Sequence, residues 1–122
     1  MRFVSRSQIE FLADIEESCR RIIEYTHGLD RDRLFSDHLR FDGVLHNLHV
    51  IGEAVKRLPD GLRGEYPAVP WREIAGVRDV VAHAYFALDL DILWRGVQVD
   101  IPRLLEQVRE ILAAERGASG PV

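Results

Sequence analysis

The sequence predicts an all-α fold, an up-and-down bundle of four to five helices with short connections. Apolar residues recur every three or four positions through most of the chain, which is the period of helices with one buried face. An alternating strand pattern nowhere persists beyond about five residues. Prolines and glycines gather between residues 59 and 70, which predicts a loop between two helical halves.

The first two long helices have clear start and stop signals. Ser7 followed by Glu10 is typical of a capping box, and Gly28 is expected to end the first helix. A short turn at residues 31–37 precedes the second helix, which is expected to stop at Pro59. Its apolar stripe comprises Phe41, Val44, Leu45, Leu48, Ile51, Val55 and Leu58, and that of the first helix comprises Phe11, Leu12, Ile15, Cys19, Ile22 and Ile23.

The second half of the chain predicts three more helical segments. Short helices are expected at residues 71–75 and 77–84, and a long one at residues 90–115. Asp89 is suited to cap this last helix. Pro102 lies inside it, so we expect the helix to kink or divide there.

Length and cysteine content limit the class of protein. A chain of 122 residues is expected to form one domain, which we assign to residues 1–116, with a disordered tail at residues 117–122. Cys19 is the single cysteine, so no intramolecular disulfide can form and a reducing compartment is expected. The sequence shows no signal peptide and no apolar run of about 20 residues, which predicts a cytoplasmic protein without a membrane partner.

The charge balance limits how nucleic acid can be bound. There are 16 basic and 20 acidic residues, for a net charge of −4, and every basic residue except Lys56 is an arginine. An acidic protein does not attract nucleic acid over a long range. RNA binding would therefore need a local arginine cluster or a complex that adds positive charge.

The segment from Gly76 to Phe86 carries the residues best suited to chemistry. On a helical wheel, one side holds an apolar stripe of Val77, Val80, Val81 and Ala84, and the other side holds Arg78, Asp79, Ala82, His83, Tyr85 and Phe86. A polar face that includes aromatic residues suggests a partner surface, and the commonest partner of a small domain is a second copy of itself.

Histidine and arginine together suit RNA cleavage without a metal. Histidine can take and give a proton near neutral pH, and arginine matches a phosphate with its fork of donors. The nucleophile in such a reaction is the 2′-hydroxyl of the RNA itself. Arg78 and His83 lie about 140° apart on one helix, so a symmetric pair of helices would be needed to gather them in one groove. The alternative is an Arg-x4-His spacing that arises by chance, with a solvated histidine.

Two stretches of the sequence resemble a known family. The first is Arg78-x-x-x-x-His83-x-Tyr85, preceded by Trp-Arg-Glu-Ile-Ala-Gly at residues 71–76 and followed by Leu-Asp at residues 88–89. The second is Leu-His-Val-Ile-Gly-Glu-Ala-Val-Lys-Arg-Leu-Pro at residues 48–59. Both resemble the HepT-like toxins, which belong to the HEPN class of all-α ribonuclease domains, and Trp94 and Pro102 also match.

The resemblance implies a role for each matching residue. Arg78 and His83 would form the ribonuclease pair, acting from both subunits of a homodimer on an RNA substrate, with no metal or cofactor. Asp79 stands where the family often has asparagine, and it could orient either member of that pair. Tyr85 matches the tyrosine that a nucleotidyltransferase antitoxin of the MNT class adenylylates. The alternative is a non-catalytic helical module that binds the nucleotidyltransferase.

Other residues give weaker indications of a functional site. Glu53 either pairs with an arginine near the groove or is solvated, and Gly52 is suited to close helix packing. His46 and His49 share a helical face with Glu53 but lack a further clustered ligand, so no metal site is expected. Cys19 lies on an apolar stripe and is expected in the core.

Overall fold

The computed structural model describes the backbone of residues 6–82 and 90–118, and the side chains of residues 7–76 and 90–117. Throughout these ranges the chain is helical or forms short connections, and no strand occurs in them. The long helices are α1 (Arg6–Thr26), α3 (His38–Arg57), α5 (Trp71–Ala82) and α8 (Ile101–Ala118). The short elements are α2 (Arg31–Ser36), α4 (Asp60–Glu65), α7 (Leu90–Arg95) and the π-helical turn η1 (Gly96–Asp100). The predicted all-α fold is confirmed.

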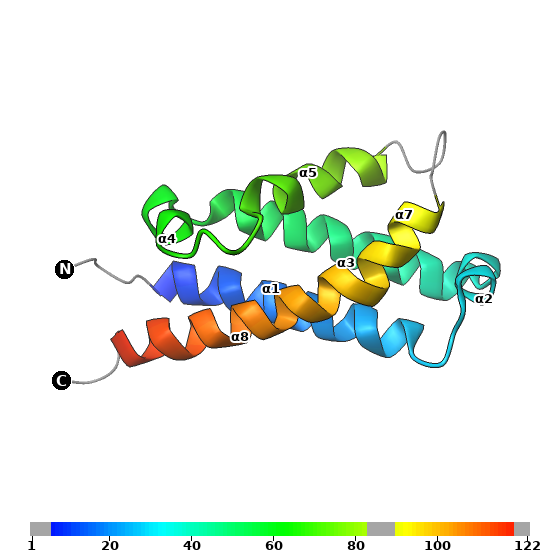
Figure 1. The fold of residues 1–122 in the computed structure, drawn as a ribbon, viewed down its shortest axis with the longest axis horizontal. Helices are drawn as coiled ribbons and strands as arrows, with labels where there is room; N and C mark the ends of the chain where they lie inside the picture. Colours follow the sequence, from blue (N-terminus) through cyan, green and yellow to red (C-terminus); the bar gives the residue numbers. More distant parts are fainter. Residues whose placement is uncertain (1–5, 83–89, 119–122) are drawn as a thin grey trace.

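The long helices form a bundle around α1. Helix α1 packs against both α3 and α8, and α5 packs against α3. Consecutive long helices run in opposite directions, and α7, η1 and α8 form one rod that crosses the bundle (Figure 1). Among the described elements, α3 therefore joins the helix that carries the candidate residues to the rest of the core.

The predicted apolar stripes form this core. The buried apolar side chains of α1 are Leu12, Ile15, Cys19 and Ile22, and those of α3 are Val44, Leu45, Leu48, Ile51, Ala54 and Val55. Helix α8 adds Leu104, Leu105, Val108, Ile111 and Leu112. Burying each of the larger aliphatic side chains contributes about 1.5–3 kcal/mol, so the bundle is held mainly by these three stripes.

The connections at the end of α1 follow from local chemistry. Gly28 has a φ of 76°, in the left-handed region where a side chain is strained, and α1 ends just before it. Asp30 then caps α2, and Asp37 caps α3. Each carboxylate accepts a hydrogen bond from the backbone N–H three residues further along the chain. The predicted stop and the predicted turn at residues 31–37 are both confirmed.

Several predicted boundaries were wrong. Helix α1 already includes Arg6, so Ser7 lies inside its first turn and not at its cap. Helix α5 continues through Gly76 as one element, because a single glycine weakens a helix by about 1 kcal/mol without breaking it. The proline-rich segment, where a loop is expected, contains α4, and α8 extends to Ala118.

The interruption before Pro102 is confirmed and takes the form of a π-helical turn. Proline has no N–H to donate to the preceding helical turn. The backbone N–H of Ile101 bonds to the carbonyl of Gly96, five residues back, and regular α-helix resumes at Ile101. Asp89, the expected cap of this last helix, lies outside the described residues.

Candidate functional site

The first residue of α5, Trp71, is buried in the core and fixes the start of the helix. Trp71 is 7% exposed, and its indole Nε1 donates a hydrogen bond of 3.0 Å to the backbone oxygen of Tyr66. The N–H of Ile74 bonds to the carbonyl of Pro70 at 3.0 Å, which closes the first helical turn. The start of α5 is thus fixed to the loop that precedes it, and the helix then lies along α3.

The first half of α5 shows which of its faces is buried. Trp71, Ile74 and Ala75 pack into or against the core, whereas Arg72 and Glu73 are exposed. Residues spaced i, i+3 and i+4 lie on one helical face, and the same spacing places positions 78 and 82 on it as well. The apolar stripe expected at Val77, Val80, Val81 and Ala84 concerns side chains outside the described part, so it stays a prediction.

The structure gives only part of the predicted site. The backbones of Arg78 and Asp79 lie in α5, and the helix continues to Ala82, immediately before His83. A helical backbone at residues 77–82 is therefore confirmed. The side chains of Arg78 and Asp79, and all of His83 and Tyr85, lie outside the described residues. The structure therefore does not test how these four groups are arranged.

Glu53 on α3 has an environment that the sequence did not reveal. It is half-buried and its Oε1 atom is shielded from solvent, although His46, His49 and Lys56 on the same side of the helix are exposed. The sequence left open whether Glu53 is solvated or paired, and the shielded oxygen argues against simple solvation. The sequence feature that indicates this burial is the position of Glu53 beside Gly52, which is buried in the packed face of α3.

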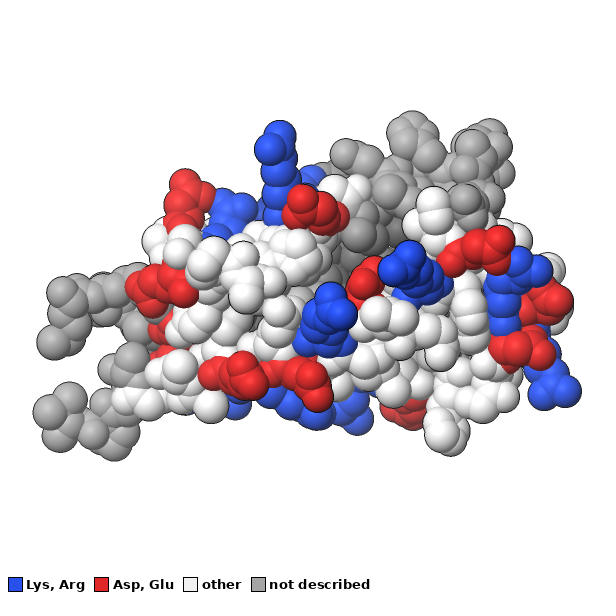
Figure 2. All heavy atoms as spheres, viewed as in Figure 1, with Lys and Arg blue, Asp and Glu red and all other residues white. Residues whose placement is uncertain are grey.

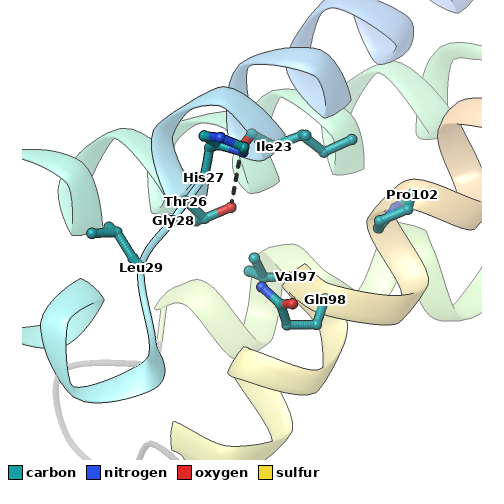
Figure 3. A pocket seen from close by; sticks show the side chains of 8 residues that line it. All are labelled: Ile23, Thr26, His27, Gly28, Leu29, Val97, Gln98 and Pro102. Atoms are coloured by element: carbon teal, nitrogen blue, oxygen red, sulfur yellow. Dashed lines mark hydrogen bonds between the residues drawn. The ribbon is translucent and has the colours of Figure 1, made fainter.

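A small pocket lies elsewhere in the bundle. It has a volume of about 230 Å³ and is lined by Ile23, Thr26, His27, Gly28, Leu29, Val97, Gln98 and Pro102. These residues come from the end of α1, the turn after it, η1 and α8 (Figure 3). Ligand pockets usually measure about 300–1,000 Å³, and α5 contributes nothing to this one.

The described surface and buried groups add few chemical candidates. Acidic and basic side chains are interspersed over the coloured part of the face in Figure 2, consistent with weak long-range attraction to RNA. Within residues 7–76 and 90–117, no three His, Cys, Asp or Glu side chains gather to hold a metal. No helix in the described part of the chain is long and apolar enough to cross a membrane. Burial raises the pKa of Cys19 to about 12, so the thiol stays protonated in the core, as its stripe predicted.

An exposed ion pair connects α2 to α7, which begins at Leu90. Arg31 in α2 pairs with Asp91 in α7, and this hydrogen bond, aided by Asp32, raises the pKa of the arginine. The pair joins α7 to α2, and α2 in turn packs against α3. Both side chains are exposed, so its contribution to stability is small.

Comparisons with known proteins place the chain in a family. The family description "Ribonuclease HepT-like" matches residues 15–111. The chain is 38% identical over 106 residues to "Putative RNase TTE0752" of Caldanaerobacter subterraneus subsp. tengcongensis, which covers 87% of this chain and 95% of that protein. It is also 38% identical over 101 residues to "Probable ribonuclease HepT" of Thermococcus cleftensis, covering 83% of this chain and 92% of the relative.

A longer relative shows the same region within a larger protein. "Gamma-glutamylcyclotransferase and putative RNase MJ0434" of Methanocaldococcus jannaschii is 38% identical over 102 residues, which cover 84% of this chain but 46% of that protein. No solved structure matches the chain with comparable significance. The family match spans α1 from Ile15 to most of α8, with the all-α bundle that the fold shows. The chain therefore belongs to the ribonuclease HepT-like family of the HEPN class.

Proposed function

We propose that this protein is the toxin of a HEPN/MNT toxin–antitoxin pair and acts as a metal-independent endoribonuclease in the cytoplasm. The observation that carries the proposal is the Arg78-x4-His83-x-Tyr85 sequence, which lies inside the region matched by the ribonuclease family. The first of these residues stands on α5, a helix anchored to the core at Trp71. The anchor of α5 supports the proposal, because a residue that binds a reacting phosphate needs a defined position.

The proposed reaction needs only proton transfer and charge stabilisation from the protein. His83 takes the proton from a ribose 2′-hydroxyl, and the 2′-oxygen attacks the adjacent phosphorus. The bond from phosphorus to the 5′-oxygen breaks, and the leaving oxygen receives a proton from a second histidine. The products are a 2′,3′-cyclic phosphate and a 5′-hydroxyl. The guanidinium of Arg78 stabilises the negative charge on the phosphate oxygens during the attack.

A homodimer would supply the second set of groups. Arg78 and His83 are separated by about 140° around a single helix, so one copy presents them to different sides. Two copies related by a two-fold axis bring the arginine of one and the histidine of the other to a shared groove. Asp79, beside Arg78, would orient the arginine or the histidine.

Substitutions at the proposed pair test the assignment. His83→Ala and Arg78→Ala should each lower the rate of RNA cleavage by about 10²- to 10⁴-fold, because general acid–base catalysis and charge stabilisation are of that size. His49→Ala and Arg72→Ala are matched controls, since both side chains are exposed in the structure. Cleavage by purified protein and melting curves should be measured together. A His83→Ala variant that cleaves as fast as the parent would contradict the role of His83.

The nucleotidyltransferase antitoxin would neutralise this toxin by a covalent modification. The Tyr85 hydroxyl gives up its proton and attacks the α-phosphorus of ATP. The bond between this phosphorus and the oxygen that bridges to the β-phosphate breaks, and pyrophosphate leaves. The attached AMP is bulky and negative, so it should repel and block RNA at the groove. Incubation with an active MNT nucleotidyltransferase and ATP should add the mass of AMP to the parent and not to Tyr85→Phe. An unchanged mass of the parent, with a partner shown to be active, would contradict this step.

A further inference from the structure

The pocket between the end of α1 and η1 is large enough for one small ring system. An apolar cavity of about 150 Å³ holds a benzene ring, and this pocket measures about 230 Å³. Val97 and Thr26 are buried in its wall, whereas His27 and Gln98 are exposed at its rim. Figure 3 shows Val97 and Gln98 across the pocket from Thr26 and His27. These four residues therefore border a space that a single planar ligand can fill.

The carbonyl of Val97 lacks its regular helical partners. In an α-helix it would accept from the N–H of Ile101, but that N–H bonds to the carbonyl of Gly96. In a π-helix it would accept from residue 102, which is a proline and has no N–H. Within η1 and α8, both of which the structure describes, the Val97 carbonyl therefore receives neither bond.

This carbonyl is placed to accept a hydrogen bond from a molecule in the pocket. A helical carbonyl points toward the following turn, which here contains Pro102, and both Val97 and Pro102 line the pocket. Val97 is 3% exposed, and a buried carbonyl is unfavourable without a donor. A ligand that carries an N–H group would satisfy it.

Thr26 adds a second acceptor on the opposite wall. Its hydroxyl donates its one proton to the carbonyl of Ile22 at 2.8 Å, so the lone pairs of Oγ1 are left to accept. None of the described residues that line the pocket is an Asp, Glu, Lys or Arg. A charged ligand would lose its hydration there without an opposite charge in the lining. The interior therefore suits an uncharged ligand with N–H donors.

The rim favours an adenine base among such ligands. A glutamine carboxamide makes two hydrogen bonds to adenine: its oxygen accepts from the amino group, and its NH₂ donates to the adjacent ring nitrogen. Histidine rings stack on nucleobases. Gln98 and His27 offer these two contacts from opposite sides of the opening (Figure 3). The amino group of adenine keeps a second N–H for the interior acceptors.

We propose that this pocket binds one adenine base, supplied by a free nucleotide or by an RNA strand. The amino group donates one N–H to the carboxamide oxygen of Gln98 and the other to the space between the Val97 carbonyl and Thr26 Oγ1. The imidazole of His27 stacks on the ring. This binding goes beyond the proposed ribonuclease activity and does not depend on it.

Titration of the ¹⁵N-labelled protein with adenosine tests the site by NMR. Adenosine should shift the amide signals of residues 26–28 and 97–98, with a Kd in the millimolar range or tighter for a ligand of this size. Inosine carries an oxygen in place of the amino group and should bind at least about 10-fold more weakly, because acceptors then face an acceptor. Uridine should also bind more weakly. The absence of a saturable shift with adenosine, or equal binding of inosine, would overturn the proposal.

Two variants test the hydrogen-bonding groups. Gln98→Leu removes two bonds and should weaken adenosine binding by about 10-fold or more, and Thr26→Val removes one acceptor and should weaken it by about 2- to 10-fold. Gln107→Leu is the matched control and should bind as the parent does, because Gln107 is a pocket-remote residue of α8 that bonds to the carbonyl of Ala68. Gln98 is exposed, so its variant decides the test where Thr26→Val does not fold. Parental binding by Gln98→Leu would overturn the proposal.

An oligonucleotide that cannot be cleaved identifies the source of the base. A 2′-O-methyl strand of uridines with one central adenosine lacks the 2′-hydroxyl that the proposed cleavage needs. If RNA supplies the base, this strand should shift the same amides and bind more tightly than adenosine and than an all-uridine strand. If a free nucleotide supplies it, adenosine should bind and the two strands should behave alike. A pocket that takes neither adenosine nor the adenosine-containing strand would overturn the proposal. A parent that does not cleave RNA contradicts only the proposed function, since these titrations require no catalysis.

Discussion

Replacing Gly28 with alanine should destabilise the bundle through the backbone alone. Gly28 follows α1 with a φ of 76°, and a Cβ built there meets no atom within 4 Å. No clash therefore contributes, and the effect is the strain of a left-handed alanine, about 1–2 kcal/mol. An unfolding entropy of about 2.1 cal/mol/K per residue gives about 0.26 kcal/mol/K for 122 residues. The melting temperature should fall by about 4–8 °C.

Gly64 provides the matched control for this prediction. It lies inside α4, its surroundings are also open within 4 Å, and it has no positive φ. Gly64→Ala should leave the melting temperature unchanged or raise it by up to about 4 °C, because alanine favours a helix by about 1 kcal/mol. Gly28→Asn should lose less than Gly28→Ala, since asparagine tolerates this region. Thermal unfolding followed by circular dichroism measures all three. A Gly28→Ala protein as stable as the parent would refute the reasoning.

Three further results are expected. The pKa of Cys19 is about 12 in the fold against 9.0 for an ordinary thiol, so the folded state keeps a proton that the unfolded chain loses. Stability should therefore fall as the pH rises above about 9, measured by urea unfolding, and Cys19→Ala should lack this slope. Tyr66→Phe removes a 3.3 Å hydrogen bond to the buried carboxylate of Glu115, which should cost about 1–3 kcal/mol in the same assay. A Tyr66→Phe protein of parental stability would contradict that contact. Asp91→Asn breaks the exposed pair with Arg31 and should change the free energy of unfolding by at most about 1 kcal/mol, less in high salt; a larger loss would show that the pair organises α7.

Most of the fold could be predicted because the apolar period is strong in the long helices. The stripes of α1 and α3 were read directly from the sequence, and their central residues are buried. Short elements were harder. Helix α4 lies among prolines and glycines that indicate a loop, but Pro59 also suits the position just before a helix, and one residue, Leu62, docks into the core. Tertiary packing of a single side chain decides such a case, and no periodic signal reports it.

The candidate site, like the fold, can be predicted from the sequence only in part. Spacing within one helix placed Arg78 on α5, and the resemblance supplied its chemistry. The burial of Glu53 depends on which helix lies beside α3, which is a long-range property that the local sequence does not carry. In the first half of α5, Trp71, Ile74 and Ala75 pack into or against the core. The stripe expected at Val77, Val80, Val81 and Ala84 stays a prediction.

The most direct test of the central claim is RNA cleavage by the purified chain, free of any nucleotidyltransferase and in the presence of EDTA. The account predicts that RNA is cut, that the fragments end in 2′,3′-cyclic phosphates and 5′-hydroxyls, and that His83→Ala abolishes the cutting. Intact RNA under these conditions, together with tight binding of the chain to the nucleotidyltransferase, would contradict the account and identify the protein as a non-catalytic binding module.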